Sequence, residues 1–231
     1  MSREKVIAVL SGGLDSATGL FLAKKNDDIL LALTFDYGQR AAQREIAAAK
    51  ALCVRAKIEH RTMTLPWLAE MTTTALVSRS DPLPSLRSNE LNDPQKTLAS
   101  ARAVWVPNRN GLFLNIAACF AEVLGASMIL TGFNREEAQT FPDNSKDFVL
   151  AMNRSLTFST QTGVRVEAPT QAMNKSEIVK EALALGLPFE LVWSCYEGLE
   201  KMCGLCESCL RSKRAYQDAG IWERMKTFFA M

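Results

Sequence analysis

The stretch that decides the fold is KVIAVLSGGLDS, residues 5–16. Residues 5–10 form a nearly continuous apolar run, which is typical of a strand buried on both faces and therefore of a parallel sheet. The turn that follows leads directly into residues 14–25, where apolar residues recur at near-helical spacing. Such a turn is where α/β sheets bind anions, because the carboxyl end of the strand and the amino terminus of the helix meet there.

The alternation of buried strand and amphipathic helix continues outward from this stretch. Short apolar runs predict strands at residues 29–35, 127–130 and 164–166, and His60 falls in a further expected strand. Helical spacing predicts helices at residues 14–25, 41–54, 111–124, 148–158 and 175–185. The alternation predicts an α/β fold with a parallel five-stranded sheet and helices on both faces.

Two regions depart from this pattern. Residues 66–102 are rich in Pro, Ser, Thr and Asn and show little periodicity, which predicts a long loop with fragments of helix; it is either a substrate lid or a disordered insertion. Residues 190–231 hold four of the six cysteines and predict a compact appendage closed by a terminal helix. We therefore expect a catalytic α/β domain over residues 1–189 and a C-terminal segment over residues 190–231.

Length and charge limit the possible functions. The 231 residues suit about one domain, and 27 basic against 25 acidic residues give a net charge of +2, which does not suggest a polyanion-binding surface. No apolar run approaches the roughly 18 residues of a membrane span, and the first residues lack the apolar core of a signal peptide. We expect a cytoplasmic protein with no membrane partner and no nucleic-acid partner.

The SGGLDS turn, residues 11–16, is a candidate phosphate loop. Its two glycines let the backbone approach a phosphate closely, and the N–H groups of the first helical turn, with the Ser11 and Ser16 hydroxyls, can surround its oxygens. The turn lacks the lysine of the G-x-x-x-x-G-K-[ST] motif, and it is not a G-x-G-x-x-G motif. The alternative is a plain strand-to-helix turn in which Ser or Asp caps the helix.

Four cysteines near the end of the chain form the pattern C-x7-C-x2-C-x2-C. They are Cys195, Cys203, Cys206 and Cys209. Four thiolates at this spacing suit one tetrahedral Zn²⁺ ion, and a site closed by four sulfurs is structural because it leaves no open position. The alternative is a set of unconnected or redox thiols. Cys53 and Cys119 fall in apolar helical patterns and are expected to be small core residues.

These motifs resemble a known family. The SGGLDS turn resembles the phosphate loop (PP-loop) of the N-type ATP pyrophosphatase superfamily, which has an adenine nucleotide alpha hydrolase-like fold. The resemblance to the 7-cyano-7-deazaguanine synthase family (QueC) runs from about Lys5 to Ile221 and is the more specific one. It is carried by SGGLDS (11–16), FDYGQR (35–40), VPNRN (106–110), TG (131–132), FPD (141–143) and the cysteine segment that starts SCYEG (194–198).

The resemblance implies an ATP-dependent ligase of queuosine precursor biosynthesis. Such enzymes convert 7-carboxy-7-deazaguanine and ammonia into 7-cyano-7-deazaguanine by adenylating the carboxylate, forming the amide and dehydrating it. The implied cofactors are ATP, Mg²⁺ and one structural Zn²⁺ per chain, and the implied assembly is a homodimer. Activating a carboxylate in this way needs positioning and charge stabilisation rather than a covalent nucleophile.

The resemblance also implies roles for particular residues. Asp15, Arg109 and Lys175 are the candidate catalytic residues; their ordinary alternatives are a helix cap and two solvated cations. The residues implied for ATP are Leu10, Ser11, Gly12, Gly13, Leu14, Asp15, Ser16, Ala17 and Thr18. Those implied for the substrate are Asp36, Tyr37, Gln39, Arg40, Phe141 and Asp143. Asp36 to Arg40 are otherwise turn-forming residues after a strand, and Asp143 is otherwise a helix cap.

Three other functions remain open. One is a related PP-loop enzyme that activates another carboxylate or an RNA base and transfers sulfur or an amine. The second is a zinc-ribbon nucleic-acid-binding module on an inactive α/β domain, against which the small net charge argues. The third is a relative that couples the activated deazaguanine to an amine on a partner protein.

Overall fold

The computed structural model describes residues 3–230 and is built around one sheet of five parallel strands. The strands are β1 (Lys5–Val9), β2 (Asp28–Asp36), β3 (His60–Thr64), β4 (Met128–Leu130) and β5 (Arg165–Glu167). Their order across the sheet is β3-β2-β1-β4-β5, and every neighbouring pair is parallel. The expected five-stranded parallel sheet is confirmed.

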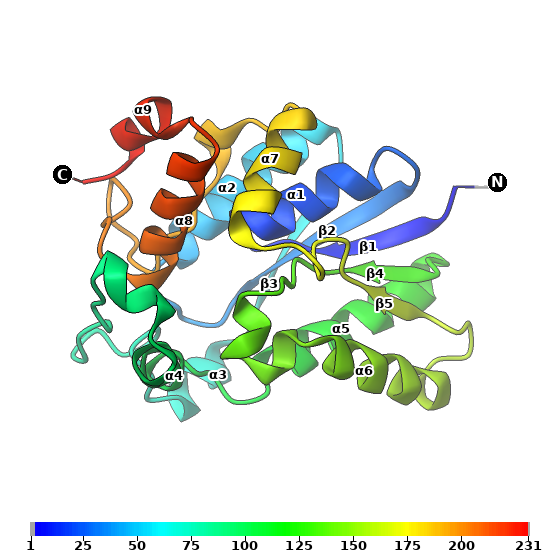
Figure 1. The fold of residues 1–231 in the computed structure, drawn as a ribbon. Helices are drawn as coiled ribbons and strands as arrows, with labels where there is room; N and C mark the ends of the chain where they lie inside the picture. The colour runs from blue at the N-terminus through cyan, green and yellow to red at the C-terminus, as the bar shows by residue number, and fades with distance from the viewer. Residues whose placement is uncertain (1–2, 231) are drawn as a thin grey trace.

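Helices cover both faces of this sheet (Figure 1). One layer holds α1 (Leu14–Ala23), α2 (Ala42–Ala56) and α7 (Lys175–Ala184), and the C-terminal helices α8 (Glu207–Asp218) and α9 (Trp222–Met225) extend it. The opposite layer holds α5 (Arg109–Leu124) and α6 (Lys146–Ser159), with α3 (Pro66–Met71) and α4 (Pro94–Ala103) beside them.

Alternate residues of β1 enter different cores, which explains its continuous apolar run. Ile7 packs with the apolar residues of α5 and α6, whereas Val6 and Ala8 pack with those of α1 and α2. All three side chains are at most 1% exposed. Because both faces of the strand are buried, a polar residue would be unfavourable at any of these positions.

The chain between β3 and α5 is more helical than expected. Residues 66–102 were predicted to be a long loop with fragments of helix, and α4 accounts for ten residues of the observed structure. Asp93 caps α4, since its carboxylate accepts hydrogen bonds from the N–H groups of Gln95 and Lys96, and Pro94 occupies the first helical turn. This Asp-Pro start signal does not depend on periodicity, so a search for periodicity overlooked it.

One expectation about the core is wrong. Cys53 is buried as expected, but Cys119 is exposed on α5. The buried stripe of this helix is formed by Phe113, Leu114, Ala117, Ala118 and Ala121. The apolar residues of α5 extend around much of the helix, so their spacing alone did not show which of them face the solvent.

The chain reverses its direction across the sheet between β1 and β4, and ligands of open α/β sheets bind at such a switch point. The loops that follow these two strands approach each other closely. A Cβ atom added to Gly132 would lie 2.4 Å from the Ser16 nitrogen, so only glycine allows this approach. Gly12, whose φ of +79° favours glycine, lies equally close to α2, where a Cβ would be 2.6 Å from the Glu45 carbonyl oxygen.

The C-terminal segment shares a core with the α/β layers. Leu14 of α1, Leu52 of α2 and Ile178 of α7 belong to the same buried cluster as Cys209 and Tyr216 of α8. The division at residues 189 and 190 therefore stays a prediction about domains, while the packing across it is continuous. Within residues 3–230, no helix combines the length and the apolar character that crossing a bilayer requires.

We expect Gly132→Ala to lower stability and to distort the loop over residues 11–16, because its methyl group would overlap the backbone of Ser16. Overpacking of this kind costs about 1–3 kcal/mol. Urea unfolding measures the loss.

Gly19→Ala is the matched control for this substitution. Gly19 lies inside α1, and a Cβ there would meet only ordinary contacts at 3.8 and 4.0 Å. The higher helix propensity of Ala should leave this variant as stable as the natural chain or more stable by about 1 kcal/mol. Equal stabilities for the two variants would contradict the close approach at Gly132.

Candidate active site

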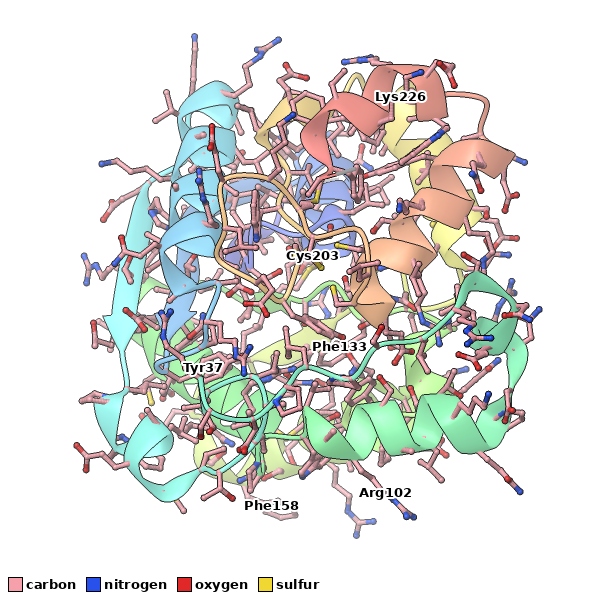
Figure 2. All side chains as sticks on the ribbon, turned by 90° about the vertical axis from the view of Figure 1, so that its left-hand side faces the viewer. Tyr37, Arg102, Phe133, Phe158, Cys203 and Lys226 are labelled. Carbon is pink, nitrogen blue, oxygen red and sulfur yellow. The ribbon has the colours of Figure 1, made fainter. Side chains whose placement is uncertain are left out.

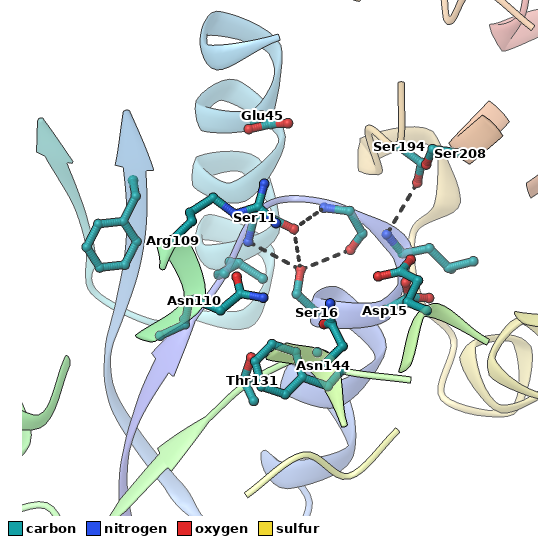
Figure 3. A pocket seen from close by; sticks show the side chains of 18 of the residues that line it. Ser11, Asp15, Ser16, Glu45, Arg109, Asn110, Thr131, Asn144, Ser194 and Ser208 are labelled. Carbon is teal, nitrogen blue, oxygen red and sulfur yellow. Dashed lines mark hydrogen bonds between the residues drawn. The ribbon is translucent and has the colours of Figure 1, made fainter. Parts of the chain in front are cut away.

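A cavity of about 230 Å³ opens at the switch point of the sheet. Its wall combines the turn after β1, the end of β4, the start of α5 and the first residues of the cysteine segment. Figure 3 shows these side chains converging from separate elements. The cavity lies where the fold places anion-binding backbone groups, at the amino terminus of α1.

The loop over residues 11–16 is held by its own serines. The Ser11 and Ser16 hydroxyls are 3.0 Å apart, the Gly13 N–H donates to the Ser11 oxygen, and the Ser16 hydroxyl donates to the Gly13 carbonyl (Figure 3). The backbone N–H group of Asp15 lies in the first turn of α1, where no intrahelical acceptor exists. The serines thus fix the loop, and the helix amides provide the anion-binding groups.

A buried charge cluster forms one end of the cavity. The Lys175 ammonium is 4% exposed and pairs with Asp15 and with Glu137, the latter at 3.3 Å. Asn134 links the two acids, because its amide donates to Asp15 at 3.1 Å and its side-chain oxygen accepts from the Glu137 N–H at 2.9 Å. Lys175 is placed by α7, whose amino terminus is closed by a capping box of Asn174 with Glu177.

Two carboxylates share one ammonium in this cluster, and this shifts their pKa values in opposite directions. Burial raises the pKa of Asp15 to about 6, although Lys175 opposes the shift. Glu137 is also buried, yet Lys175 and the hydrogen bond with Asn134 hold its pKa below the usual value. Burial alone would lower the pKa of Lys175, but the two acids raise it, so the lysine stays charged.

The other end of the cavity is formed by Arg109 and Tyr37. The Arg109 guanidinium donates to the Tyr37 hydroxyl at 3.1 Å and lies 5.7 Å from the centre of its ring. Among residues 3–230, no carboxylate lies within ion-pair distance of Arg109. Burial alone would lower its pKa, but Tyr37 and nearby acids raise it. A charged guanidinium on a cavity wall with only a neutral partner can bind an anion.

The four cysteines predicted to bind a metal lie together. The Sγ atoms of Cys195, Cys203, Cys206 and Cys209 are all within 4.8 Å of one another, and those of Cys203 and Cys209 are 3.9 Å apart. Tetrahedral zinc–sulfur geometry requires a separation of about 3.8 Å between sulfurs. Backbone N–H groups of Glu197 and Leu205 point at Cys195 and Cys203, as suits sulfurs that carry negative charge. The residues fit one structural metal ion.

The cysteine segment also supports the phosphate loop. The Trp193 N–H donates to the Gly12 carbonyl at 2.9 Å, and the Leu14 N–H points at the Ser194 hydroxyl at 3.4 Å. Cys195 and the adjacent Tyr196 line the cavity. Figure 2 shows Cys203 near the centre of this side of the molecule rather than at its edge. The metal site therefore borders the cavity wall.

Only part of the predicted site lies on the cavity wall. The predicted residues that line the cavity are Leu10, Ser11, Gly13, Leu14, Asp15, Ser16, Tyr37, Arg109, Phe141 and Lys175. Those that lie elsewhere are Gly12, Ala17, Thr18, Asp36, Gln39, Arg40 and Asp143. Ala17 and Thr18 are buried within α1, where the Thr18 hydroxyl donates to the Leu14 carbonyl.

The polar residues after β2 mainly build the turn. Asp36 accepts from the Gly38 N–H, and the buried Gln39 accepts from the Tyr37 N–H and donates to the Phe35 carbonyl. Arg40 pairs with Glu197 at 3.0 Å and donates to two carbonyls of the segment that follows α3. Of this predicted substrate group, only Tyr37 reaches the cavity.

Asp143 neither lines the cavity nor caps α6. Ser145 is the cap, since its hydroxyl accepts from the Phe148 N–H at 3.1 Å. The Asp143 carbonyl accepts from the Asn110 amide, and burial raises the pKa of its carboxyl group. The next residue, Asn144, is 5% exposed and lines the cavity.

The sequence interpretation gave no site role to several polar residues of the wall, among them Glu45, Asn110, Glu137 and Asn144. Asn110 and Asn144 directly adjoin residues that were singled out. Glu137 lies in the chain after β4, from which the sequence interpretation took Asp143 as the acidic residue of the site. Glu45 gives no local signal, because a glutamate within a helix is ordinarily solvated.

The sheet order, the loop over residues 11–16 and the cavity at the switch point define an open parallel α/β protein with a candidate ligand site at the carboxyl edge of its sheet. A family model described as "Queuosine biosynthesis protein QueC" matches residues 5–220. The chain belongs to the QueC family.

Curated relatives match over nearly their whole length. The 7-cyano-7-deazaguanine synthase of Pelotomaculum thermopropionicum is 54% identical over 93% of this chain and 97% of the relative. The protein of the same name from Methanosarcina barkeri is 50% identical over 94% and 95% of the two chains. Among solved structures, NMN synthetase from Francisella tularensis is similar with a TM-score of 0.46 and 18% identity, over 97% of this chain and 85% of that one.

We expect Asp15→Asn to gain stability over the natural chain as the pH rises from about 4 to about 7. The pKa of Asp15 is raised from 3.8 to about 6, so its ionisation costs the folded state free energy. The stabilising contribution of the protonated form is complete below 3.8 and is lost as the pH passes 6, and it amounts to at most about 3 kcal/mol. Urea unfolding at several pH values measures the difference.

Asp147→Asn is the control, because Asp147 is exposed at the start of α6. The difference in unfolding free energy between Asp15→Asn and the natural chain should change with pH. A constant difference would contradict the burial of a charged Asp15.

Proposed function

We propose that this chain converts 7-carboxy-7-deazaguanine and ammonia into 7-cyano-7-deazaguanine at the expense of ATP. The names of relatives that share 45–54% of its residues over more than nine-tenths of the chain support the reaction. The observation that carries the proposal is the cavity itself, which has a helix terminus suited to anions and an Arg109 guanidinium that pairs with no carboxylate of residues 3–230. The helix terminus suits the phosphates of ATP, and the Arg109 guanidinium suits a substrate carboxylate.

The cavity suits carboxylate activation. The substrate carboxylate attacks the α-phosphorus of ATP, pyrophosphate leaves, and an acyl-adenylate forms. Ammonia then displaces AMP to give the amide, and a second ATP activates the amide oxygen so that dehydration gives the nitrile. In our proposal the first-turn amides of α1 hold the departing pyrophosphate, Lys175 stabilises its charge, and Arg109 orients the carboxylate.

The acidic cluster fits a magnesium ion. Asp15 and Glu137 carry one more negative charge than Lys175 balances, and the Asp15 Oδ1 atom is buried without a hydrogen-bond partner among residues 3–230. Carboxylate oxygens are the ligands that Mg²⁺ prefers. We propose that Asp15 and Glu137 hold Mg²⁺, which would neutralise phosphate charge when ATP is bound.

The metal of the four-cysteine site is proposed to be zinc, one ion per chain. Four sulfurs close the coordination shell, so the ion supports the fold and the wall formed by Ser194 and Tyr196 rather than the chemistry. A homodimer, a cytoplasmic location and the absence of nucleic-acid partners stay predictions from the sequence. So does a lid role for residues 66–102, of which Leu76 reaches the cavity.

Incubation of the protein with 7-carboxy-7-deazaguanine, ammonium and MgATP is expected to give amide and then nitrile, with AMP and pyrophosphate, in mass spectra. Arg109→Gln should lower kcat/KM for the deazaguanine acid by about 10- to 100-fold, the value of a hydrogen bond to a charged group. Arg102→Gln, at an exposed position of α4, is the control. The proposal fails if the natural chain consumes no ATP in the presence of the acid.

Cys206→Ser is expected to lose the metal and to destabilise the fold, because metal binding and folding are coupled. A loss on the order of 3 kcal/mol corresponds to roughly 6–12 °C in Tm for a chain of this size. Elemental analysis and thermal unfolding measure the two effects. Cys119→Ser is the control, since Cys119 is exposed. A Cys206→Ser protein that holds no metal but has an unchanged Tm would contradict a structural role for the metal.

A further inference from the structure

Glu45 is a carboxylate on the cavity wall to which the proposed steps give no role. It lies in the first turn of α2 and faces the same cavity as Arg109 and Ser11 (Figure 3). Its Oε2 atom accepts from the Gln39 amide at 2.7 Å. Within the described part of the chain, no cationic side chain lies within ion-pair distance of it. Glu45 is partly buried, and a carboxylate withdrawn from water without a cation is costly, so its presence on a cavity wall calls for a ligand.

The turn after β2 holds this carboxylate in position. Gln39 is 4% exposed and makes three hydrogen bonds: it accepts from the Tyr37 N–H and donates to the Phe35 carbonyl and to Glu45. Because the glutamine is fixed by the turn, it fixes the Oε2 atom of Glu45, while Oε1 makes no hydrogen bond within residues 3–230. The Gln39 side chain therefore acts as a positioning group for Glu45 rather than as a substrate contact.

The charges around Glu45 favour a small cation. Arg109 lies close enough to attract Glu45 electrostatically, yet the two do not form an ion pair. A substrate carboxylate bound by Arg109 would bring a second negative charge to this end of the cavity. Two carboxylates that face each other in a poorly solvated site are stabilised by a cation between them. Ammonium has the right charge, size and N–H donors, and the proposed reaction consumes it.

We propose that Glu45 binds the ammonium ion that supplies the nitrogen of the product and accepts a proton from it, so that the ammonia formed can attack. The inference rests on the proposed function. The nitrogen attacks the acyl carbon of the adenylate, the acyl C–O bond breaks, and AMP leaves with the electron pair of that bond. One proton of the ammonium passes to Glu45, and the second proton lost from nitrogen is released to water.

Glu45→Gln tests this role with two nucleophiles. Gln keeps an oxygen that can accept from Gln39 but lacks the negative charge, so we expect kcat/KM for ammonium to fall about 10²- to 10⁴-fold, the usual contribution of a general base. Hydroxylamine is largely uncharged at neutral pH and needs neither the anion nor the proton acceptor. Its conversion of the adenylate into the hydroxamate, measured by mass spectrometry, should change less than about threefold.

Three further measurements separate the possible failures. Exchange of labelled pyrophosphate into ATP with the deazaguanine acid reports adenylation before any nitrogen enters; its absence in the natural chain would overturn the proposed function and this inference together. Equal losses with both nucleophiles, while this exchange persists, would overturn the role of Glu45 alone. A raised KM for the deazaguanine acid with an unchanged KM for ammonium would also overturn the role of Glu45, since that result would mean that Glu45 binds the deazaguanine ring.

Two other variants complete the experiment. Glu59→Gln is the control, because the Glu59 side chain is 65% exposed. Glu45→Asp keeps the charge but withdraws it from the cavity, so its kcat/KM for ammonium should lie between those of the natural chain and Glu45→Gln. If Glu45→Gln does not fold, a Glu45→Asp protein that uses ammonium as well as the natural chain does overturns the proposal.

Discussion

The close approach of Gly132 to the backbone of Ser16 is the constraint on which the rest of the site depends. It brings the loop after β4 against the loop after β1, at the point where the chain reverses direction across the sheet. The contact places Asn134 and Glu137 beside Asp15, and α7 brings Lys175 to the same acids. Three distant parts of the chain therefore form one charge cluster because Gly132 has no side chain, which lets the two backbones approach closely.

The C-terminal segment is part of the site and not only an appendage. It closes the cavity through Ser194 and Tyr196, and it binds the Gly12 carbonyl through the Trp193 N–H. A metal ion held by the adjoining cysteines would make this wall rigid, so in our proposal metal binding and nucleotide binding are coupled through one short stretch of chain. The proposed ion would then act on the site through the fold and take no part in the chemistry.

The two ends of the cavity have different electrostatic properties. At the end that holds Lys175, carboxylates exceed cations, which suits a metal–phosphate complex. At the other end Arg109 and Glu45 face the cavity without pairing with each other, so each can bind a ligand group of the opposite charge. An acyl transfer between an anionic acid and a cationic amine needs both kinds of group close together.

Predictions from the sequence succeeded where the signal is local. The five parallel strands follow from continuous apolar runs, the loop from glycines and serines between a strand and a helix, and the clustering of the four cysteines from their spacing. They failed where packing decides. Cys119 lies in an apolar helix but faces outward. The substrate roles of Asp36 and Gln39 stay predictions, because Asp36 bonds within the turn after β2, while Gln39 bonds within the turn and to Glu45 of α2.

The sequence by itself determined the class of fold, the position of the loop over residues 11–16 and the set of cysteines that cluster, because each depends on residues that are neighbours in the chain. Only the tertiary structure decided which polar side chains face the cavity. Glu45, Glu137 and Asn144 reach it from a helix and two loops whose meeting depends on sheet order and on close backbone contacts. No local sequence pattern predicts those contacts, since they form only when the helices pack against the sheet.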